Sequence, residues 1–572
     1  MDGLQDRAPQ RQRGCCPALR RLVPAGFGAE AWTLFVLSGP LFLFQVLNFM
    51  IFVVSSVFCG RLGTVELASV TLSVAFVNVC GVSVGFGFAS ACDTLMSQSY
   101  GGPNKKFVGI ILQRGVLMLL LCCFPCWGLF INTEQILLLF RQDPGVSRLS
   151  QEYVLIFIPA LPAIFLYGLL AKYLQNQLFQ GIVWPQVLSS ITGNIVNGLA
   201  NYVLVSMLSL GVRGSAYANT ISQFVQVIFL FLYIVLKKLY LETWAGWSSQ
   251  CLQDWGPFFF LAIPSMLMMC IEWWAYEIGS FLMGLLSVLD LSAQAIIYEV
   301  SAVIYMVPMG LSIAVCVRVG TALGAADTVQ AKRSAISGVL CTVGTSLVMG
   351  VLLSTLRSKV GHIFTSDEEV ISLVEQALPV YTVFQLFEAL CCVYGGILRG
   401  TGKQAFGAIV NAIMYYVIAL PLGIVLTFVI RMRIMGLWLG LLTSGLMAVV
   451  AFVVYTIRLN WKLAAEEAQR RMGLPQQQRS GNLASMVHRP GPEKVVASSV
   501  ATGSYPGIIL TTYSRPECHL DLSRTPEVAC AFSVPASKLS VKQLALRRTL
   551  ALGVASALLT VGLVIRCLTS SH

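Results

Sequence analysis

Four glutamates lie inside long apolar stretches of the sequence, where no lysine, arginine or histidine obviously neutralises them; they are Glu272, Glu277, Glu299 and Glu388. An ionisable side chain near the centre of a bilayer costs roughly 2.5–3.5 kcal/mol on insertion scales. Such a group therefore normally faces a bundle interior or a water-filled cavity, on the path of an ion or substrate. The glutamates predict a path for cations and protons.

Aromatic residues accompany these carboxylates. The segment from Glu272 to Glu277 reads Glu-Trp-Trp-Ala-Tyr-Glu, which places Glu272 one helical turn from Tyr276. Carboxylates with aromatic neighbours bind bulky organic cations through Coulomb attraction and cation–π contact. Tyr305 gives Glu299 a similar setting further along the next apolar stretch, and Tyr381 precedes Glu388. The alternative for Trp273 and Trp274, interfacial anchoring, fits their depth within the stretch less well.

Burial also favours proton binding by these carboxyl groups. A carboxyl group removed from water can hold a proton near neutral pH and release it when a cation approaches. Proton and cation then compete for one site, as an antiporter requires. All four histidines lie in predicted loops or tails, so the sequence shows no histidine proton relay and no histidine metal site. Sodium binding by carboxylate and carbonyl oxygens remains an alternative to proton binding.

The elements that must position these residues are membrane-spanning helices. Of the 572 residues, 56% are hydrophobic and only 11% are charged, which is far outside the range of soluble proteins. Lipid offers the backbone no hydrogen-bond partners, and near-continuous apolar runs favour helices over a barrel. We predict an all-α polytopic membrane protein. At about 20 residues per span, the spans are expected near 31–58, 66–91, 108–131, 148–171, 184–208, 214–236, 257–284, 291–317, 334–356, 370–397, 404–429 and 434–457, with a thirteenth helix at 544–568.

The spans divide the chain into two lobes with polar flanking segments. We expect a cytosolic N-terminal tail (1–30), a first lobe (31–236), a cytosolic linker (237–256), a second lobe (257–457), a polar, disordered cytosolic segment (458–543) and the last helix (544–568). Basic residues gather in the tails and alternate loops, which places the N-terminus in the cytosol and, with an odd number of spans, the C-terminus outside. The net charge of +12 therefore indicates topology and not nucleic-acid binding.

The two lobes are related by an internal repeat. At an offset of about 224 residues, Pro40 falls on Pro264 and Asp143-x-x-Val146 falls on Asp367-x-x-Val370. Six helices followed by six related helices in the same orientation predict a parallel two-lobe transporter. The acidic residues break this symmetry, because Asn48 occupies the position equivalent to Glu272. The acidic chemistry therefore belongs to the second lobe.

The remaining polar residues of the spans have more ordinary roles. The amides are expected mainly to bond across helices, with substrate contact as an alternative; they are Gln45, Asn48, Asn78, Asn194, Asn197 and Asn201. Arg114, Lys172, Arg318 and Arg399 lie near helix ends and are expected to extend toward the interface. The cysteines lack the paired C-x-x-C…C-x-x-C spacing of a zinc site and are expected to pack as small hydrophobic residues, except that Cys59 borders the predicted pathway.

Several short motifs together resemble the multidrug and toxin extrusion (MATE) family, and most of all its mammalian kidney-type members. They are Ser83–Gly87, Ala91–Leu95, Arg318–Ala325, Gly396–Gly400 and the Glu272–Glu277 segment. The resemblance runs through all twelve core helices. It implies a V-shaped two-lobe fold, alternating access and no cofactor, with the proton as coupling ion.

The resemblance also implies a substrate class and a set of site residues. The expected activity is exchange of extracellular protons for intracellular organic cations, such as quaternary ammonium and biguanide-type compounds. The expected location is an apical or canalicular plasma membrane of epithelial cells such as those of the kidney tubule. Proton and cation binding would fall to the four glutamates, and substrate contacts to Trp273, Tyr276, Tyr305, Gln45, Asn78 and Cys59.

Other functions are weaker on the sequence. A sodium-coupled exporter stays open, whereas a flippase for lipid-linked phosphates would need a groove lined by basic residues. A membrane-embedded enzyme is disfavoured, because the apolar stretches hold no histidine to act as a base and the chain has no H-E-x-x-H segment. A channel or receptor would show no counterflow.

Overall fold

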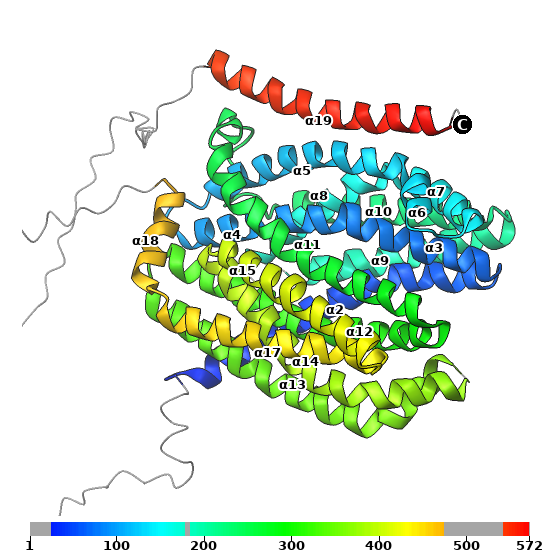
Figure 1. The fold of residues 1–572 in the computed structure, drawn as a ribbon. Helices are drawn as coiled ribbons and strands as arrows, with labels where there is room; N and C mark the ends of the chain where they lie inside the picture. The colour runs from blue at the N-terminus through cyan, green and yellow to red at the C-terminus, as the bar shows by residue number, and fades with distance from the viewer. Residues whose placement is uncertain (1–23, 178–182, 366, 474–540, 571–572) are drawn as a thin grey trace, which may run out of the picture. The chain divides into compact units, whose positions relative to one another are not determined.

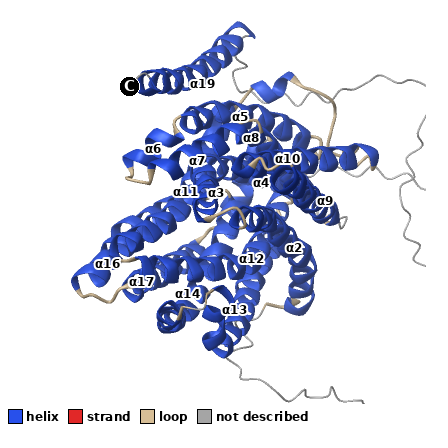
Figure 2. Cartoon of the chain, turned by 90° about the vertical axis from the view of Figure 1, so that its right-hand side faces the viewer, coloured by secondary structure: helices blue, strands red, loops and turns tan. Residues whose placement is uncertain are grey.

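The structure is a computed structural model that describes residues 24–177, 183–365, 367–473 and 541–570. Within these ranges the chain forms helices and loops and no strand, which confirms the predicted all-α fold (Figure 2). The first half, up to residue 236, contains α2 (Phe27–Gly60), α3 (Thr64–Val77), η1 (Asn78–Val82), α4 (Ser83–Gly101), α5 (Phe107–Ile131), α6 (Thr133–Leu139), α7 (Pro144–Phe157), α8 (Ala160–Gln175), α9 (Trp184–Asn201), η3 (Tyr202–Met207) and α10 (Gly211–Leu236).

The second half begins after a short turn, η4 (Ser249–Leu252). It contains α11 (Trp255–Leu286), α12 (Val288–Gly324), α13 (Thr328–Phe364), α14 (Glu368–Thr401), α15 (Gln404–Asn411), η5 (Ala412–Ala419), α16 (Leu420–Ile424), η6 (Val425–Val429) and α17 (Ile434–Arg458), followed by α18 (Trp461–Arg471) and α19 (Val541–Ser570). Figure 1 shows α5, α7 and α8 of the first half on one side, α13, α14 and α17 of the second half on the other, and α4, α11 and α12 between them.

Most of these helices can cross a membrane. Among the described residues, 11 helices are long and apolar enough, or up to 12 if α7 and α8, which meet at a bend of 58°, form one span. The predicted span 184–208 is present as α9 and η3, but it is less apolar than the others because Asn194, Asn197 and Asn201 lie within it. The helix therefore depends on polar partners inside the protein.

Those partners form a buried amide network in the first half. Asn197 donates to Asn219 Oδ1 of α10 at 2.6 Å, and Ser55 Oγ of α2 donates to the same oxygen at 2.7 Å. Asn201 donates to Ser55 Oγ at 3.2 Å, and Asn219 donates to the hydroxyl of Tyr153. Bonds of this kind tie helices together where lipid provides no polar groups. The expected interhelical role of Asn197 and Asn201 is confirmed.

Two further amides have the same role. Asn194 donates to the Leu47 carbonyl of α2 at 2.7 Å. Asn48 accepts bonds through Oδ1 from Ser190 of α9 at 3.3 Å and from Gln226 of α10 at 3.4 Å. The helices α2, α9 and α10 are thus joined along their length by side-chain hydrogen bonds.

The internal repeat is visible in matching local features. Asp143 caps α7 by accepting from the backbone N–H groups of Gly145 and Val146, and Asp367 caps α14 by accepting from that of Glu369. Proline lies inside α2 at Pro40 and inside α11 at Pro264. A π-helical segment precedes the last helix of each half, η3 in the first and η6 in the second. Equivalent sequence positions therefore form equivalent structures.

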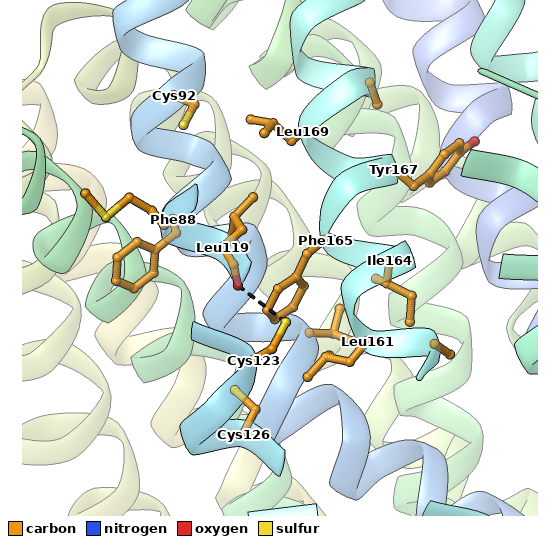
Figure 3. Packing of buried hydrophobic residues seen from close by; sticks show 14 of the residues in the cluster. Phe88, Cys92, Leu119, Cys123, Cys126, Leu161, Ile164, Phe165, Tyr167 and Leu169 are labelled. Atoms are coloured by element: carbon orange, nitrogen blue, oxygen red, sulfur yellow. Dashed lines mark hydrogen bonds between the residues drawn. The ribbon is translucent and has the colours of Figure 1, made fainter. Parts of the chain in front are cut away.

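Several cysteines pack as hydrophobic side chains. Figure 3 shows Cys92, Cys123 and Cys126 among Leu119, Phe165 and other core residues of α4, α5 and α8. The thiol of Cys123 donates to the Leu119 carbonyl at 3.4 Å. Cys92, Cys123 and Cys126 are free thiols. Their packing matches the small hydrophobic role expected of most of them.

The basic residues expected to extend toward the interface bond inside the protein instead. Lys172 Nζ lies 3.0 Å from Oδ2 of Asp93, whose side chain is 1% exposed. Arg318 of α12 pairs with Glu30 of α2 at 2.6 Å. Arg114 is buried and donates to the Gln250 carbonyl at 3.3 Å. The expectation was wrong for these residues because an acceptor on another part of the protein lies within reach of each.

The two halves meet closely at the end that carries these pairs. Glu30 accepts bonds from Arg318, from Ser334 at 2.6 Å and from Gln330 at 2.8 Å, so α2 is tied to both α12 and α13. Gln98 of α4 donates to the Gly400 carbonyl at 3.0 Å. These partners of Glu30 and Gln98 belong to the second half. This set of contacts is called here the closed end.

The polar segment predicted for 458–543 is not disordered throughout. Its first part forms α18, where Asn460 caps the helix and Ala464, Ala465 and Ala468 are buried. Arg471, at the end of α18, donates to Gln98 Oε1 at 3.3 Å and to the Thr401 carbonyl at 3.4 Å. An amphipathic helix with small residues on one face packs closely, and this one adds to the closed end. Residues 474–540 lie outside the described residues.

The predicted thirteenth helix is present as α19 and packs along α5 (Figure 1). Asn132 donates to the Gly562 carbonyl at 2.8 Å, and Arg566 pairs with Glu134 at 3.2 Å. The guanidinium of Arg548 lies 3.7 Å from the Trp255 ring. At the other terminus, α2 begins at Phe27, so the predicted tail 1–30 is shorter than expected.

The closed end requires a glycine at the end of α12. A Cβ at Gly324 would overlap the Gln98 carbonyl oxygen of α4, whereas a Cβ at Gly344 of α13 would meet no atom within 4 Å. We expect Gly324→Ala to destabilise the protein by about 1–3 kcal/mol, the usual effect of overpacking. The thermal unfolding midpoint in detergent should fall for Gly324→Ala but not for the control Gly344→Ala, in which alanine improves helix propensity. Equal midpoints for both variants would contradict this account.

Candidate functional site

A cavity in the second half brings together predicted site residues from separate helices. Its lining residues come from α11, α12, α14, α15, η5 and α17, and they enclose about 750 Å³ of space, part of it open to solvent. Glu272 and Trp273 of α11, Tyr305 of α12 and Glu388 of α14 all line it.

Glu388 has a tyrosine partner on the facing helix. Tyr276 donates its hydroxyl to Glu388 Oε1 at 2.6 Å, and the Glu388 side chain is buried. The short distance is typical of a charge-assisted bond to a carboxylate. The Tyr276 ring also packs against Tyr415, with centroids 6.2 Å apart. Tyr276 therefore fixes the carboxylate from behind the cavity lining.

Glu272 has a similar but looser partner. Tyr305 donates to Glu272 Oε1 at 3.3 Å from α12. The tyrosine lies six residues after Glu299 in sequence, yet the structure pairs it with Glu272. Trp273 lines the same cavity, and its ring packs against Phe86 of α4 with centroids 6.4 Å apart. Both cavity carboxylates thus have one hydroxyl donor and aromatic surroundings.

The other two glutamates do not line this cavity. Glu277 accepts a long bond from Tyr298 at 3.5 Å and is absent from the cavity lining. Glu299 is exposed on α12. The sequence grouped the four acids by their depth in the apolar stretches, but depth does not determine the direction in which each side chain points around its helix axis. In this conformation two of the four share one cavity.

The expected substrate contacts also divide into two groups. Gln45 of α2 donates to the sulfur of Met309 at 2.9 Å, and Met309 lines the cavity, so Gln45 lies directly behind the lining. Asn78 is the first residue of η1 and is half-buried outside the lining. Cys59 is fully buried in the hydrophobic core of the first half. Asn78 and Cys59 therefore do not contact this cavity in the structure.

Arg399 is a cavity residue that the sequence interpretation missed. Its side chain lines the cavity and donates to Ser312 Oγ of α12 at 2.7 Å. It was expected to extend toward the interface, and this was wrong. Arg399 follows Glu388 by eleven residues, which is close to three helical turns and so places both on one face of α14. That spacing was the signal in the sequence.

Among the described residues, no group of three or more histidine, cysteine or acidic side chains is arranged to hold a metal ion. The chemistry that the cavity offers is therefore that of carboxylates, a guanidinium, hydroxyls, thioethers and aromatic rings. Groups of these kinds can bind a charged organic molecule without forming covalent bonds to it.

A bundle of membrane-length helices in two related halves, with a charged cavity inside, is the arrangement of a membrane transporter. The MatE family model matches the chain twice, at residues 40–203 and 264–425. The two matches begin 224 residues apart (264 − 40), which is the offset of the internal repeat. The chain belongs to the MatE family of multidrug and toxin extrusion transporters.

Relatives of known identity agree over the full length. The chain is 70% identical to the human Multidrug and toxin extrusion protein 2, with 100% of both chains covered. It is 54% identical to the Multidrug and toxin extrusion protein 1 of Rattus norvegicus, which covers 93% of this chain and 92% of the relative. These relatives are transporters and not enzymes.

Solved structures support the same fold. The crystal structure of the eukaryotic MATE transporter AtDTX14 matches with a TM-score of 0.74 at 30% identity, covering 78% of this chain and 99% of that one. The Vibrio cholerae MATE transporter VcmN in its bent form matches with a TM-score of 0.65 at 16% identity, covering 78% of this chain and 100% of that one. The second match bears on the fold alone.

The bond between Tyr276 and Glu388 can be measured by a double-mutant cycle. We expect Tyr276→Phe and Glu388→Gln to show an interaction free energy of about 0.5–3 kcal/mol in thermal unfolding, because each removes part of one hydrogen bond to a charged group. Tyr394→Phe is the control, since Tyr394 lies on the same helix as Glu388 and packs on Phe452 at 6.1 Å. Strictly additive effects of the first pair would contradict the bond.

Proposed function

We propose that this protein is a proton-coupled antiporter that exports small organic cations by alternating access. The observation that carries the proposal is the placing of Glu272 and Glu388 in one cavity with Trp273 and Tyr305. Carboxylates attract a cation and aromatic faces accommodate its apolar surface. Relatives at high identity are named for multidrug and toxin extrusion, which supports the same substrate class.

Coupling follows from competition at the carboxylates. A proton and an organic cation both neutralise a buried carboxylate, so binding of one weakens binding of the other. Tyr276 and Tyr305 hold the two carboxylates in place through hydroxyl donors in either case. Protons arriving from outside displace the cation, and a cation arriving from the cytosol displaces the protons. The exchange needs no cofactor.

The closed end provides the barrier for this cycle. It lies beside Lys105 and Lys106, just before α5, and beside Lys332 and Arg333, near the start of α13; the distribution of basic residues assigns this end to the cytosol. Loading of a cytosolic cation then requires the contacts of Glu30 and Gln98 with the second half to separate. Release on the other side requires them to form again. On this proposal, the conformation described above corresponds to the stage with the cytosolic path shut.

The proposed membrane location follows from the direction of the proton gradient. The proton gradient favours export at a plasma membrane facing acidic fluid, such as the apical membrane of kidney tubule cells, with the N-terminus in the cytosol and the C-terminus outside. Quaternary ammonium and biguanide-type compounds are the expected substrates. The contribution of Glu277 and Glu299 would come in other conformations of the cycle, when α11 and α12 change their exposure.

The first test is uptake of radiolabelled tetraethylammonium into inside-acidified vesicles. Glu272→Gln and Glu388→Gln should each lower proton-stimulated uptake at least tenfold at matched expression, because each removes a carboxylate that exchanges proton for cation. Glu369→Gln is the control, since Glu369 is exposed in the first turn of α14, the helix that carries Glu388. Full uptake by both cavity variants would contradict the proposed site.

A second test sets proton coupling against sodium coupling. One pH unit corresponds to about 1.4 kcal/mol per proton, so one-for-one exchange should change the steady accumulation ratio about tenfold per unit. The ratio should rise with inside acidity in sodium-free buffer. Accumulation that follows a sodium gradient and ignores pH would replace the proton by sodium as coupling ion.

A further inference from the structure

The lining of the cavity carries a positive charge as well as two carboxylates. Of the residues that line it, all within the described part of the chain, three are charged: Glu272, Glu388 and Arg399. The Arg399 guanidinium lies close enough to Glu272 for direct electrostatic interaction. Among the described residues, no carboxylate oxygen lies within 4.0 Å of its nitrogens. Its charge is therefore not cancelled by an ion pair and acts on the cavity.

A hydrogen bond holds this charge in place. Arg399 donates to Ser312 Oγ at 2.7 Å, and Ser312 in turn donates to the Cys392 carbonyl at 2.7 Å. Ser312 is fully buried, so the anchor belongs to the packed contact between α12 and α14. A guanidinium anchored in this way cannot leave the cavity wall without breaking that contact. It stays beside the cavity while a substrate binds.

The charged groups around the cavity do not change its net charge. Asp93 is the acidic group next to Arg399 on the side of the closed end, and it is already paired with Lys172 at 3.0 Å. Asn176 also donates to Asp93 Oδ1 at 2.8 Å. The pair adds no net charge. With both cavity carboxylates ionised, two negative charges and one positive charge give the cavity a net charge of −1.

We propose that Arg399 is a specificity-determining residue that limits the cavity to one positive charge of substrate, so that monovalent organic cations bind in preference to divalent ones. The inference rests on the proposed function, because it takes Glu272 and Glu388 as the cation-binding groups. A bound monocation brings the net charge of the cavity to zero. A dication of the same length places its second charge in a cavity that the first charge and Arg399 have already neutralised.

A matched pair of inhibitors tests this in the unmodified protein. Hexamethonium carries two trimethylammonium groups on a six-carbon chain, and (6-hydroxyhexyl)trimethylammonium replaces one of them by a hydroxyl. The monocation should inhibit proton-stimulated uptake of tetraethylammonium about tenfold more strongly, a difference of about 1.4 kcal/mol. Equal potency, or stronger inhibition by hexamethonium, would overturn the inference.

Variants of Arg399 assign the preference to this side chain. In Arg399→Gln the relative potency of hexamethonium should rise about tenfold, because the net charge of the cavity becomes −2. Arg399→Lys and Ser312→Ala keep the charge and should keep the ratio of the two potencies. A purely structural role for Arg399 would lower transport without changing the ratio, and an unchanged ratio in Arg399→Gln would refute the assignment.

The outcomes separate this inference from the proposed function. If the unmodified protein shows no proton-stimulated uptake of tetraethylammonium, the antiporter proposal fails. If uptake is present but the matched pair shows no preference, only the role of Arg399 fails. If Arg399→Gln does not reach the membrane, the comparison of the two inhibitors in the unmodified protein still tests the preference for monovalent cations, and equal potency there would overturn the inference.

Discussion

A carboxylate inside a membrane protein needs a partner, and this requirement shapes the second half of the fold. Burial of an unpaired charge is costly, so each cavity carboxylate has a hydrogen-bond donor on a facing helix. Tyr276 on α11 serves Glu388 on α14, and Tyr305 on α12 serves Glu272 on α11. The three helices must therefore stand at fixed rotations to one another, and the cavity between them follows from that arrangement.

The first half meets the same requirement differently. Its network of Ser55, Asn197, Asn201 and Asn219 is neutral, fully buried and bonded within itself. Neutral amides and hydroxyls bond across helices without changing charge during a cycle, whereas carboxylates can bind and release protons. The internal repeat thus supplies two related scaffolds, one held together by amides and the other carrying titratable groups. The chemical difference between the halves arises from side-chain replacement on a shared backbone.

Charged and polar contacts close the structure where the halves meet. Glu30 joins α2 to α12 and α13, and Gln98 joins α4 to α14, so these bonds form only while the halves are in contact. The glycine at the end of α12 permits that contact, because its missing side chain lets the backbone of α4 approach. If the two halves separated, water could form hydrogen bonds with the polar groups of these contacts. Such contacts suit a barrier that opens and closes.

The helices, their repeat and the four intramembrane acids could all be predicted from the sequence, because apolar length and the cost of intramembrane charge are properties of composition and spacing. The choice of which acids share a cavity depended on tertiary packing. Periodicity defines the faces of a helix but not the neighbour that each face meets, so Tyr305 pairs with Glu272 although Glu299 is nearer in sequence. For the same reason the sequence places Arg399 on the same helix face as Glu388, but the position of Arg399 in the cavity depends on Ser312 of another helix.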